Sequence, residues 1–256
     1  HQGSGRLVFE NCLVNNITNL TLVLSIPAIF WGLNLFKDKG KVPADTRINH
    51  LSLLLSILAL IFFSLAVFFV SKDGTITASD GMLLIGIFLF WQLFHLFDVL
   101  KNNTRKNRKI KKRILIDIVI IGFCAWGVFT STEGLINWIN DHGKGFFASS
   151  NLGFLSGILM VIPNAFLAIY YAAANRSEIA YSSQIGDCHI CIPLCIGLFA
   201  IFSPITMSAQ FFTPLFILIG ASAGHFVFTI ITGRLPRSAG IALACLYAFF
   251  IYKEII

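Results

Sequence analysis

Two short polar stretches interrupt apolar segments of the chain at places that match each other. The first is residues 15–19 (NNITN) and the second is residues 187–191 (DCHIC). Amide and carboxylate oxygens are ligands that hard cations such as calcium prefer. Polar groups at bilayer depth are costly unless they have partners, and transporters built from two repeats hold their ions where such segments meet. The two stretches therefore predict a cation site inside a membrane protein.

Both stretches belong to an internal repeat. Residues 6–33 align with residues 178–205 without a gap, so that the two polar stretches coincide. An odd number of membrane crossings separates the two copies, which makes them run in opposite directions through the membrane. The match returns where residues 80–83 (DGML) resemble residues 239–242 (AGIA), at the start of the last apolar segment of each half.

The composition is that of an integral membrane protein. Of the 256 residues, 56% are hydrophobic and 12% are charged, and the mean hydropathy is +0.80. Many apolar runs reach the roughly 20 residues that a helix needs to cross about 30 Å of hydrocarbon. The predicted fold class is all-α, a polytopic membrane protein of about eight transmembrane helices in one membrane domain. The predicted spans are 14–36, 50–70, 82–100, 114–139, 150–172, 181–205, 210–232 and 238–256.

The distribution of basic residues predicts the orientation. The loops on one side of the predicted spans hold most of the 19 Lys and Arg residues, chiefly in residues 37–47 and 101–113. Cytoplasmic loops carry such an excess, so both ends of the chain are predicted to be non-cytoplasmic, in a plasma membrane or a bacterial inner membrane. The net charge of +7 follows from this bias and from attraction to anionic headgroups, and no nucleic-acid partner is expected.

Three segments resemble motifs of the sodium/calcium exchanger family, within the calcium/cation antiporter superfamily. Its repeats carry Gly-(Thr/Asn)-Ser-x-Pro-Glu on one helix and Gly-Ser-Asn-x-x-Asn, before a leucine-rich run, on the next. Residues 14–24 (VNNITNLTLVL) resemble the second motif in the first repeat, and residues 159–164 (LMVIPN) and 186–191 (GDCHIC) stand where the second repeat should carry both. In two departures, Asn164 replaces the motif's Glu and Asp187 occupies a position that is usually Ser.

The resemblance covers nearly the whole chain and implies an inverted-repeat exchanger fold of ten helices in two halves of five. This chain would begin just before the third helix and lack the first two. Residues 1–100 would form the first half, 101–113 a basic cytoplasmic loop and 114–256 the second half. The implied function is secondary active antiport by alternating access, with calcium exchanged for sodium or protons. Neither a cofactor nor enzymatic chemistry is implied, and the expected partners are the lipid bilayer and the transported cations.

The resemblance also assigns candidate cation ligands. In the family, the motif helices converge so that carboxylates and flanking hydroxyl, amide and backbone oxygens hold calcium and sodium. The corresponding residues here are Asn15, Asn19, Asn164, Asp187 and Cys191. Asn19 matches the family's Asn directly. Asn164 lacks the charge of the Glu that it replaces, and Asp187 supplies a charge one helix away.

Other interpretations are open for these residues. In one interpretation, the asparagines at 15, 16 and 19 lie near a membrane face and pair between helices, and Asp187 is an interfacial carboxylate. Cys188, Cys191 and Cys195 with His189 have the spacing of a zinc or copper(I) site, although small cysteines at close helix contacts are the commoner explanation.

The function has alternatives as well. A monovalent sodium/proton exchanger or a non-transporting homologue would carry the same repeat. An intramembrane enzyme would need a metal triad or an activated nucleophile, and the sequence has neither a His-Glu-x-x-His nor a Gly-x-Ser-x-Gly motif. No segment has the pattern of a channel's selectivity filter. His225, on a face of small residues, is interpreted as a packing residue that makes hydrogen bonds.

Overall fold

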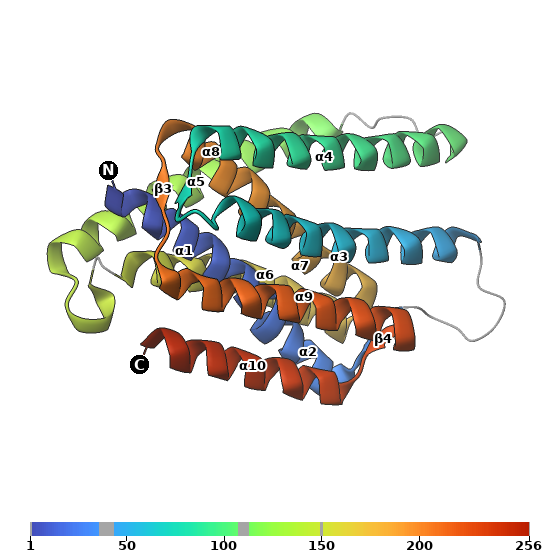
Figure 1. Ribbon diagram of the computed structural model, residues 1–256. Coiled ribbons are helices and arrows are strands. Elements are labelled where there is room, and N and C mark those ends of the chain that lie inside the picture. Colours follow the sequence, from blue (N-terminus) through green and yellow to red (C-terminus); the bar gives the residue numbers. More distant parts are fainter. Residues whose placement is uncertain (1, 36–43, 107–112, 149–150, 256) are drawn as a thin grey trace. The chain divides into compact units, whose positions relative to one another are not determined.

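The computed structural model describes residues 2–35, 44–106, 113–148 and 151–255, most of which are helical (Figure 1). In chain order the elements are α1 (Gln2–Thr18), η1 (Asn19–Val23), α2 (Leu24–Trp31), β1 (Leu33–Asn34), α3 (Ala44–Val70), β2 (Thr75–Ile76), α4 (Ala78–Lys106), α5 (Arg113–His142), η2 (Gly145–Phe147), α6 (Leu152–Ala173), α7 (Ser177–His189), η4 (Ile190–Cys195), α8 (Ile196–Phe202), β3 (Ile205–Thr206), η5 (Ala209–Phe211), α9 (Phe212–Thr232), β4 (Arg234–Leu235) and α10 (Arg237–Ile255).

The chain forms two compact units. The first holds His1–Phe88 and Gly153–Ile256, and the second holds Leu89–Leu152. The second unit contains the end of α4, the apolar helix α5 and the short turn η2. Helices α4 and α5 extend into both ends of the predicted basic loop 101–113, and residues 107–112 of that loop lie outside the described residues. Every interaction considered below lies in the first unit.

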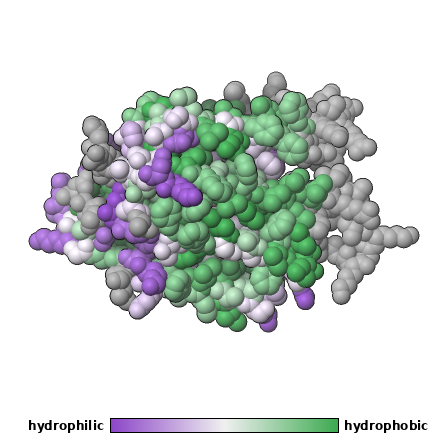
Figure 2. All heavy atoms as spheres, viewed as in Figure 1, coloured by the Kyte–Doolittle hydropathy of each residue, from purple (hydrophilic) through white to green (hydrophobic). Residues whose placement is uncertain are grey.

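The membrane fold is confirmed. Within the described residues, seven helical segments are long and apolar enough to cross a membrane. They are Gly5–Trp31, Leu51–Val70, Ala78–Phe97, Ile116–Ile139, Leu152–Ala173, Ser177–Phe202 and Phe212–Thr232. Each overlaps a predicted span, and α10, with 19 residues, lies at the place of the eighth. Hydrophobic residues dominate the middle of the surface in Figure 2, as contact with lipid requires.

The first helical segment differs from its predicted span of 14–36. Elements α1, η1 and α2 follow one another without a break from Gln2 to Trp31. Polar residues near position 10 lower the hydropathy of the first half, which is why the apolar run alone predicted a later start. Phe9, Leu13 and Asn16 are at most 1% exposed, so protein covers one face of this half. The polar stretch 15–19 therefore lies in the middle of the segment.

A π-helical turn begins within the end of each polar stretch. In the first repeat it is η1, and in the second it is η4. Pro193 lies inside η4 and has no N–H to donate to a preceding carbonyl, which favours a local departure from α-helix. In the first repeat, the hydroxyls of Thr18 and Thr21 donate to the backbone carbonyls of Val14 and Ile17. Turns of this kind widen the helix locally and are frequent at functional sites.

Tertiary contacts follow the sequence repeat. Strand β1 pairs with β4, and β3, which aligns with β1 in the repeat, pairs with β2; both pairs are antiparallel. Gly81 of α4 lies so close to α8 that a Cβ added to it would stand 3.1 Å from the Cβ of Ala200. Gly240 of α10 has the matching relation to α2, where the distance to the Cβ of Ala28 would be 2.9 Å. Because Ala28 and Ala200 coincide in the aligned repeat, the inverted repeat is present in the packing as well as in the sequence.

Helix α6 packs closely on α1 through two glycines. A Cβ added to Gly157 would stand 2.8 Å from the Cβ of Val14, and one added to Gly153 would stand 2.7 Å from the carbonyl oxygen of Leu7. The side-chain amide of Asn11 donates to Ser156 Oγ at 2.7 Å across the same contact. Small residues allow transmembrane helices to approach in this way.

We expect Gly157→Ala to destabilise the protein by about 1–3 kcal/mol, because the added methyl group overpacks the contact with Val14. Thermal unfolding of the detergent-purified protein measures the change. Gly220→Ala is the matched control, since the space around Gly220 on α9 is open and alanine favours helix. Equal stability of the two variants would contradict the tight α1–α6 contact.

The start of α1 and the end of α10 lie at the same end of the first unit (Figure 1), and their side of the membrane stays a prediction. We expect alkaline phosphatase fused after Ile256 to be active in bacterial cells, because a non-cytoplasmic C-terminus would place the enzyme where its disulfides form. A fusion after Arg176, in the turn between α6 and α7, is the expected inactive control. The opposite pattern of activity would reverse the predicted orientation.

Candidate cation site

Two separate segments bring amides to a carboxylate on a third segment, in the middle of the bundle. Asp187 Oδ2 accepts hydrogen bonds from Asn19 Nδ2 at 2.7 Å and from Asn164 Nδ2 at 2.9 Å. Asn19 begins η1, Asn164 follows Pro163 within α6, and Asp187 lies near the end of α7. The carboxylate is thus held by one amide that is 168 residues away in the sequence and one on the preceding helix, 23 residues away.

The other two predicted residues join the same cluster. Asn15 Oδ1 accepts a hydrogen bond from Asn19 Nδ2 at 3.1 Å and lies 3.5 Å from the Sγ atom of Cys191. Asn164 Nδ2 also lies 3.5 Å from Asn19 Oδ1. The structure therefore brings together Asn15, Asn19, Asn164, Asp187 and Cys191. Their role as cation ligands stays a prediction.

The arrangement is symmetric in the repeat. Asn16 Nδ2 donates to the backbone carbonyl of Cys188 at 3.0 Å, and these two residues coincide in the alignment, being 172 positions apart. On either side of this contact, Asn19 meets Asp187 and Asn15 meets Cys191. In the aligned repeat, Asn19 is equivalent to Cys191 and Asn15 to Asp187, so the two pairs are equivalent to each other. The two polar stretches therefore lie against each other about a local two-fold axis.

Burial bears on the alternative in which the asparagines lie near a membrane face. Asn15, Asn16 and Asn19 are at most 2% exposed and lie halfway along the segment Gln2–Trp31. Asp187 is partly buried and lies mid-way along Ser177–Phe202. These residues therefore lie in the interior and not near a membrane face. The second part of this alternative, pairing between helices, is present.

The cluster offers hard oxygen ligands and one negative charge. A carboxylate and several amide oxygens suit sodium or calcium, whereas transition metals prefer nitrogen and sulfur ligands. Among the described residues, Asp187 is the only carboxylate that hydrogen-bonds within the cluster. A bound cation would compete with the amide N–H groups that now stabilise this charge. The amides would then turn their oxygens toward the ion.

The soft-metal alternative lacks a suitable cluster. Within the described residues, no group of three or more His, Cys, Asp or Glu side chains is arranged to hold a metal ion. His189 interacts instead with α3, where its Nε2 atom lies 2.8 Å from the carbonyl oxygen of Ser56 and its ring meets Phe63 edge to face. Cys188 is buried against Asn16.

A buried histidine supports the π-turn that carries Asn19. His225 Nε2 lies 2.7 Å from the carbonyl oxygen of Leu20, and its Nδ1 lies 2.8 Å from the hydroxyl of Tyr181. Since a carbonyl only accepts, Nε2 carries the proton and Nδ1 accepts from the tyrosine. His225 is 1% exposed, and this role agrees with its interpretation as a packing residue.

The two repeats are covered unequally. Helix α6 covers the face of α1 that includes Val14, and most of the segment from Phe9 to Ala28 is buried. The corresponding face of α7 is exposed at Ser182, Ser183 and Gly186, and no atom lies within 4 Å of a Cβ added to Gly186. Asp187 lies beside this exposed strip, which accounts for its being only partly buried.

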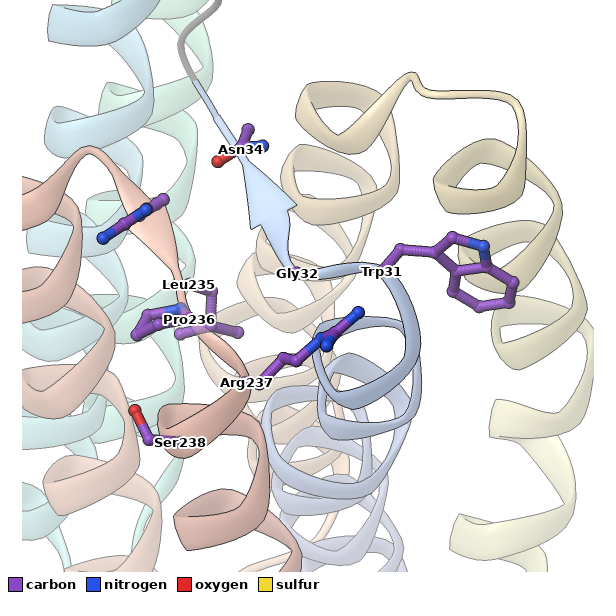
Figure 3. A pocket seen from close by; sticks show the side chains of 8 residues that line it. Trp31, Gly32, Asn34, Leu235, Pro236, Arg237 and Ser238 are labelled. Atoms are coloured by element: carbon purple, nitrogen blue, oxygen red, sulfur yellow. The ribbon is translucent and has the colours of Figure 1, made fainter.

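A pocket of about 390 Å³ lies elsewhere, at the paired strands β1 and β4 (Figure 3). Its lining includes Arg234 and Arg237, and the Arg237 guanidinium donates to the carbonyl of Phe30 at 3.2 Å. Two positive charges make this pocket unsuitable for a cation. None of the clustered polar residues lines it.

Sequence reasoning left two buried amides out of the candidate ligands. They are Asn16, which belongs to the polar stretch 15–19 but was not among the predicted ligands, and Gln184 on α7. Their equivalents in the other repeat are Cys188 and Cys12, so each position is an amide in one copy only. The signal that finds them is burial without a complete set of partners, which appears only in the tertiary structure.

Comparison with known proteins gives a family and a fold. The family profile described as sodium/calcium exchanger protein matches residues 1–97 and 115–255. A solved structure of the sodium-calcium exchanger NCX_Mj, soaked with 100 mM Na⁺ and 10 mM Sr²⁺, is similar with a TM-score of 0.65 and 18% identity, over 96% of this chain and 76% of that chain. The same exchanger soaked with 10 mM of each ion gives 0.66 and 19%, with the same coverage. A search of curated proteins finds no match.

At these identities the structural likeness concerns the fold, whereas the family profile takes in both polar stretches and Asn164. The repeat, the facing polar stretches and the interior carboxylate agree with that match. On this evidence the chain belongs to the sodium/calcium exchanger protein family.

Proposed function

We propose that this protein is a secondary active antiporter that exchanges calcium for sodium at the cluster around Asp187. The observation that carries the proposal is the carboxylate of Asp187, held in the interior of the bundle by Asn19 and Asn164. A charge at this depth is costly and marks ion pathways in membrane proteins. Membership of an exchanger family supports cation antiport as the activity.

The repeat supports alternating access as the mechanism. Asn19 belongs to the first repeat and Asp187 to the second, so movement of one repeat against the other changes the distance between two candidate ligands. Inverted repeats that rock about a shared site expose it to each side of the membrane in turn. The π-turns η1 and η4 lie at this junction, where local changes of helix geometry would alter the ligand positions.

A second candidate is exchange of monovalent cations, such as sodium for protons. It is favoured by the charge of the cluster, because one carboxylate neutralises sodium but leaves calcium with an excess positive charge. Asn164 is the residue that makes this difference, since it stands where the family motif has Glu. The two candidates share the site and differ in the ion that it accepts.

We expect Asp187→Asn to lower exchange at least about tenfold, because it removes the charge while keeping the size of the side chain. The measurement is uptake of radioactive calcium or sodium by proteoliposomes, with and without an opposing sodium or proton gradient. Glu178→Gln is the matched control, because Glu178 is an exposed carboxylate on the same helix.

The pattern of uptake separates the candidates. Gradient-dependent calcium uptake that Asp187→Asn loses and Glu178→Gln keeps would support calcium exchange. Sodium uptake driven only by a proton gradient would support the monovalent candidate. Full activity in Asp187→Asn would overturn both assignments of this site.

We expect Asn164→Glu to favour divalent over monovalent cations, because it adds a second carboxylate within reach of Asp187. The ratio of half-saturating sodium to half-saturating calcium in the same uptake assay is expected to rise at least about tenfold. Asn164→Gln is the control that lengthens the side chain without adding charge. The same ratio in both variants would exclude Asn164 as a determinant of ion charge.

A further inference from the structure

The cavity at the paired strands β1 and β4, here called the arginine pocket, is separate from the cation cluster (Figure 3). Its volume of about 390 Å³ lies within the range of about 300–1,000 Å³ that small-molecule sites have. Arg234 and Arg237 line it, and Trp31, Asn34 and Ser238 are among its other lining residues. Two guanidinium groups in one cavity suit an anion.

Both guanidinium groups keep hydrogen-bond donors for a ligand. Arg237 donates to the carbonyl oxygen of Phe30 at 3.2 Å, and within the described residues this is the only hydrogen bond that either guanidinium makes. An arginine side chain carries five N–H donors in a planar fork, which matches the oxygens of carboxylate and phosphate groups. No described carboxylate belongs to the lining. The arginine pocket therefore offers two positive charges and several unused donors to one anion.

The matching place in the first repeat already holds an anion of its own. Residues 80–83 align with residues 239–242, so the start of α4 corresponds to the start of α10. At α4, the Asp80 carboxylate accepts hydrogen bonds from the backbone N–H of Thr77 at 2.8 Å and from the Thr77 hydroxyl at 2.6 Å. The first copy is thus closed by its own side chains.

The second copy has the opposite charge at this place. Ala239 and Pro236 occupy the positions of the aspartate and the threonine, and they offer neither a carboxylate nor a hydroxyl. Arg234 and Arg237 occupy positions that are uncharged in the first copy. The exchange of one negative group for two positive groups leaves room for a negative group from outside the chain.

The arginine pocket lies at the level of lipid headgroups. The membrane-spanning segments Gly5–Trp31 and Phe212–Thr232 end at its edge. Trp31 is 45% exposed, and tryptophan side chains at the ends of spans are typical of the membrane–water interface. The predicted orientation places this end of the bundle at the cytoplasmic face, where anionic lipids are concentrated.

We propose that the arginine pocket binds a phosphate group, and that the headgroup of an anionic phospholipid provides it. Arg234 and Arg237 bind the phosphate oxygens, and Trp31 contacts the lipid at the interface. Because Arg237 begins α10 and also contacts Phe30 of α2, a lipid bound here stabilises the contact between these two helices. The site does not depend on the cation cluster or on the proposed function.

The test is thermal unfolding of the protein, purified in a neutral detergent and titrated with dioleoylphosphatidylglycerol. A ligand that binds only the folded state raises the unfolding temperature. Two further titrations separate the possible sources of phosphate. Dioleoylphosphatidylcholine has the same acyl chains without the net charge, and inorganic phosphate has the charge without the chains. We expect half-saturation by the anionic lipid at a concentration at least about tenfold lower than by either of the other two.

Paired substitutions identify the ligands. We expect the double variant Arg234→Gln with Arg237→Gln to raise half-saturating phosphatidylglycerol at least about tenfold. Arg234→Lys with Arg237→Lys keeps both charges but loses the planar fork, so a smaller loss is expected. Arg176→Gln is the matched control, because Arg176 is an exposed arginine on the same predicted side of the membrane and outside the pocket lining. Size-exclusion profiles establish that each variant is folded.

The outcomes are separate from those of the transport assay. Unchanged affinity in the folded double glutamine variant would overturn the site. An equal loss in Arg176→Gln would also overturn it, because general attraction to a basic surface would then explain the binding. Stabilisation by inorganic phosphate alone, abolished in the double glutamine variant, would keep the phosphate site and overturn the lipid as its source. None of these readouts requires ion uptake, so failure of the proposed function leaves them unchanged.

Discussion

The structure depends on one constraint, which is a carboxylate kept inside a membrane bundle. Asp187 is stabilised there by amide hydrogen bonds from Asn19 and Asn164, and these two residues come from different parts of the chain. A buried charge without such partners would be too costly. The requirement fixes how α6, α7 and the turn η1 must meet, and the close glycine contacts between α1 and α6 make that meeting possible.

The inverted repeat explains why the polar residues meet at all. Two copies of one segment, facing each other about a local axis, place their equivalent positions in contact, as Asn16 and Cys188 are. Polar side chains near that axis then find partners in the opposite copy. The same geometry places one π-turn on each side. Such turns break the regular backbone pattern where ligand positions would have to change during transport.

The repeat is also where the two halves have diverged. The contact between Asn15 and Cys191 is the repeat equivalent of the contact between Asn19 and Asp187. Only the second pair contains a carboxylate, so the charge lies on one side of the axis. Helix α6 covers α1, whereas the matching face of α7 is exposed near Gly186. The amides Asn16 and Gln184 each have a cysteine at the equivalent position of the other copy. A symmetric scaffold thus carries an asymmetric set of polar side chains, with the one carboxylate on one side of the axis.

The sequence alone determined the all-α membrane class, the spans and the repeat, because hydropathy and self-alignment depend only on residue order. Residues 15–19 and 187–191 were expected to meet, since inverted repeats bring equivalent segments together. The start of the first helix was predicted too late, because hydropathy cannot distinguish a polar residue facing protein from one facing water. Only the tertiary structure decided that Asp187 accepts hydrogen bonds from both Asn19 and Asn164, because such partners are set by how the helices pack. Among the described residues, it also leaves one amide oxygen each of Asn16 and Gln184 without a partner.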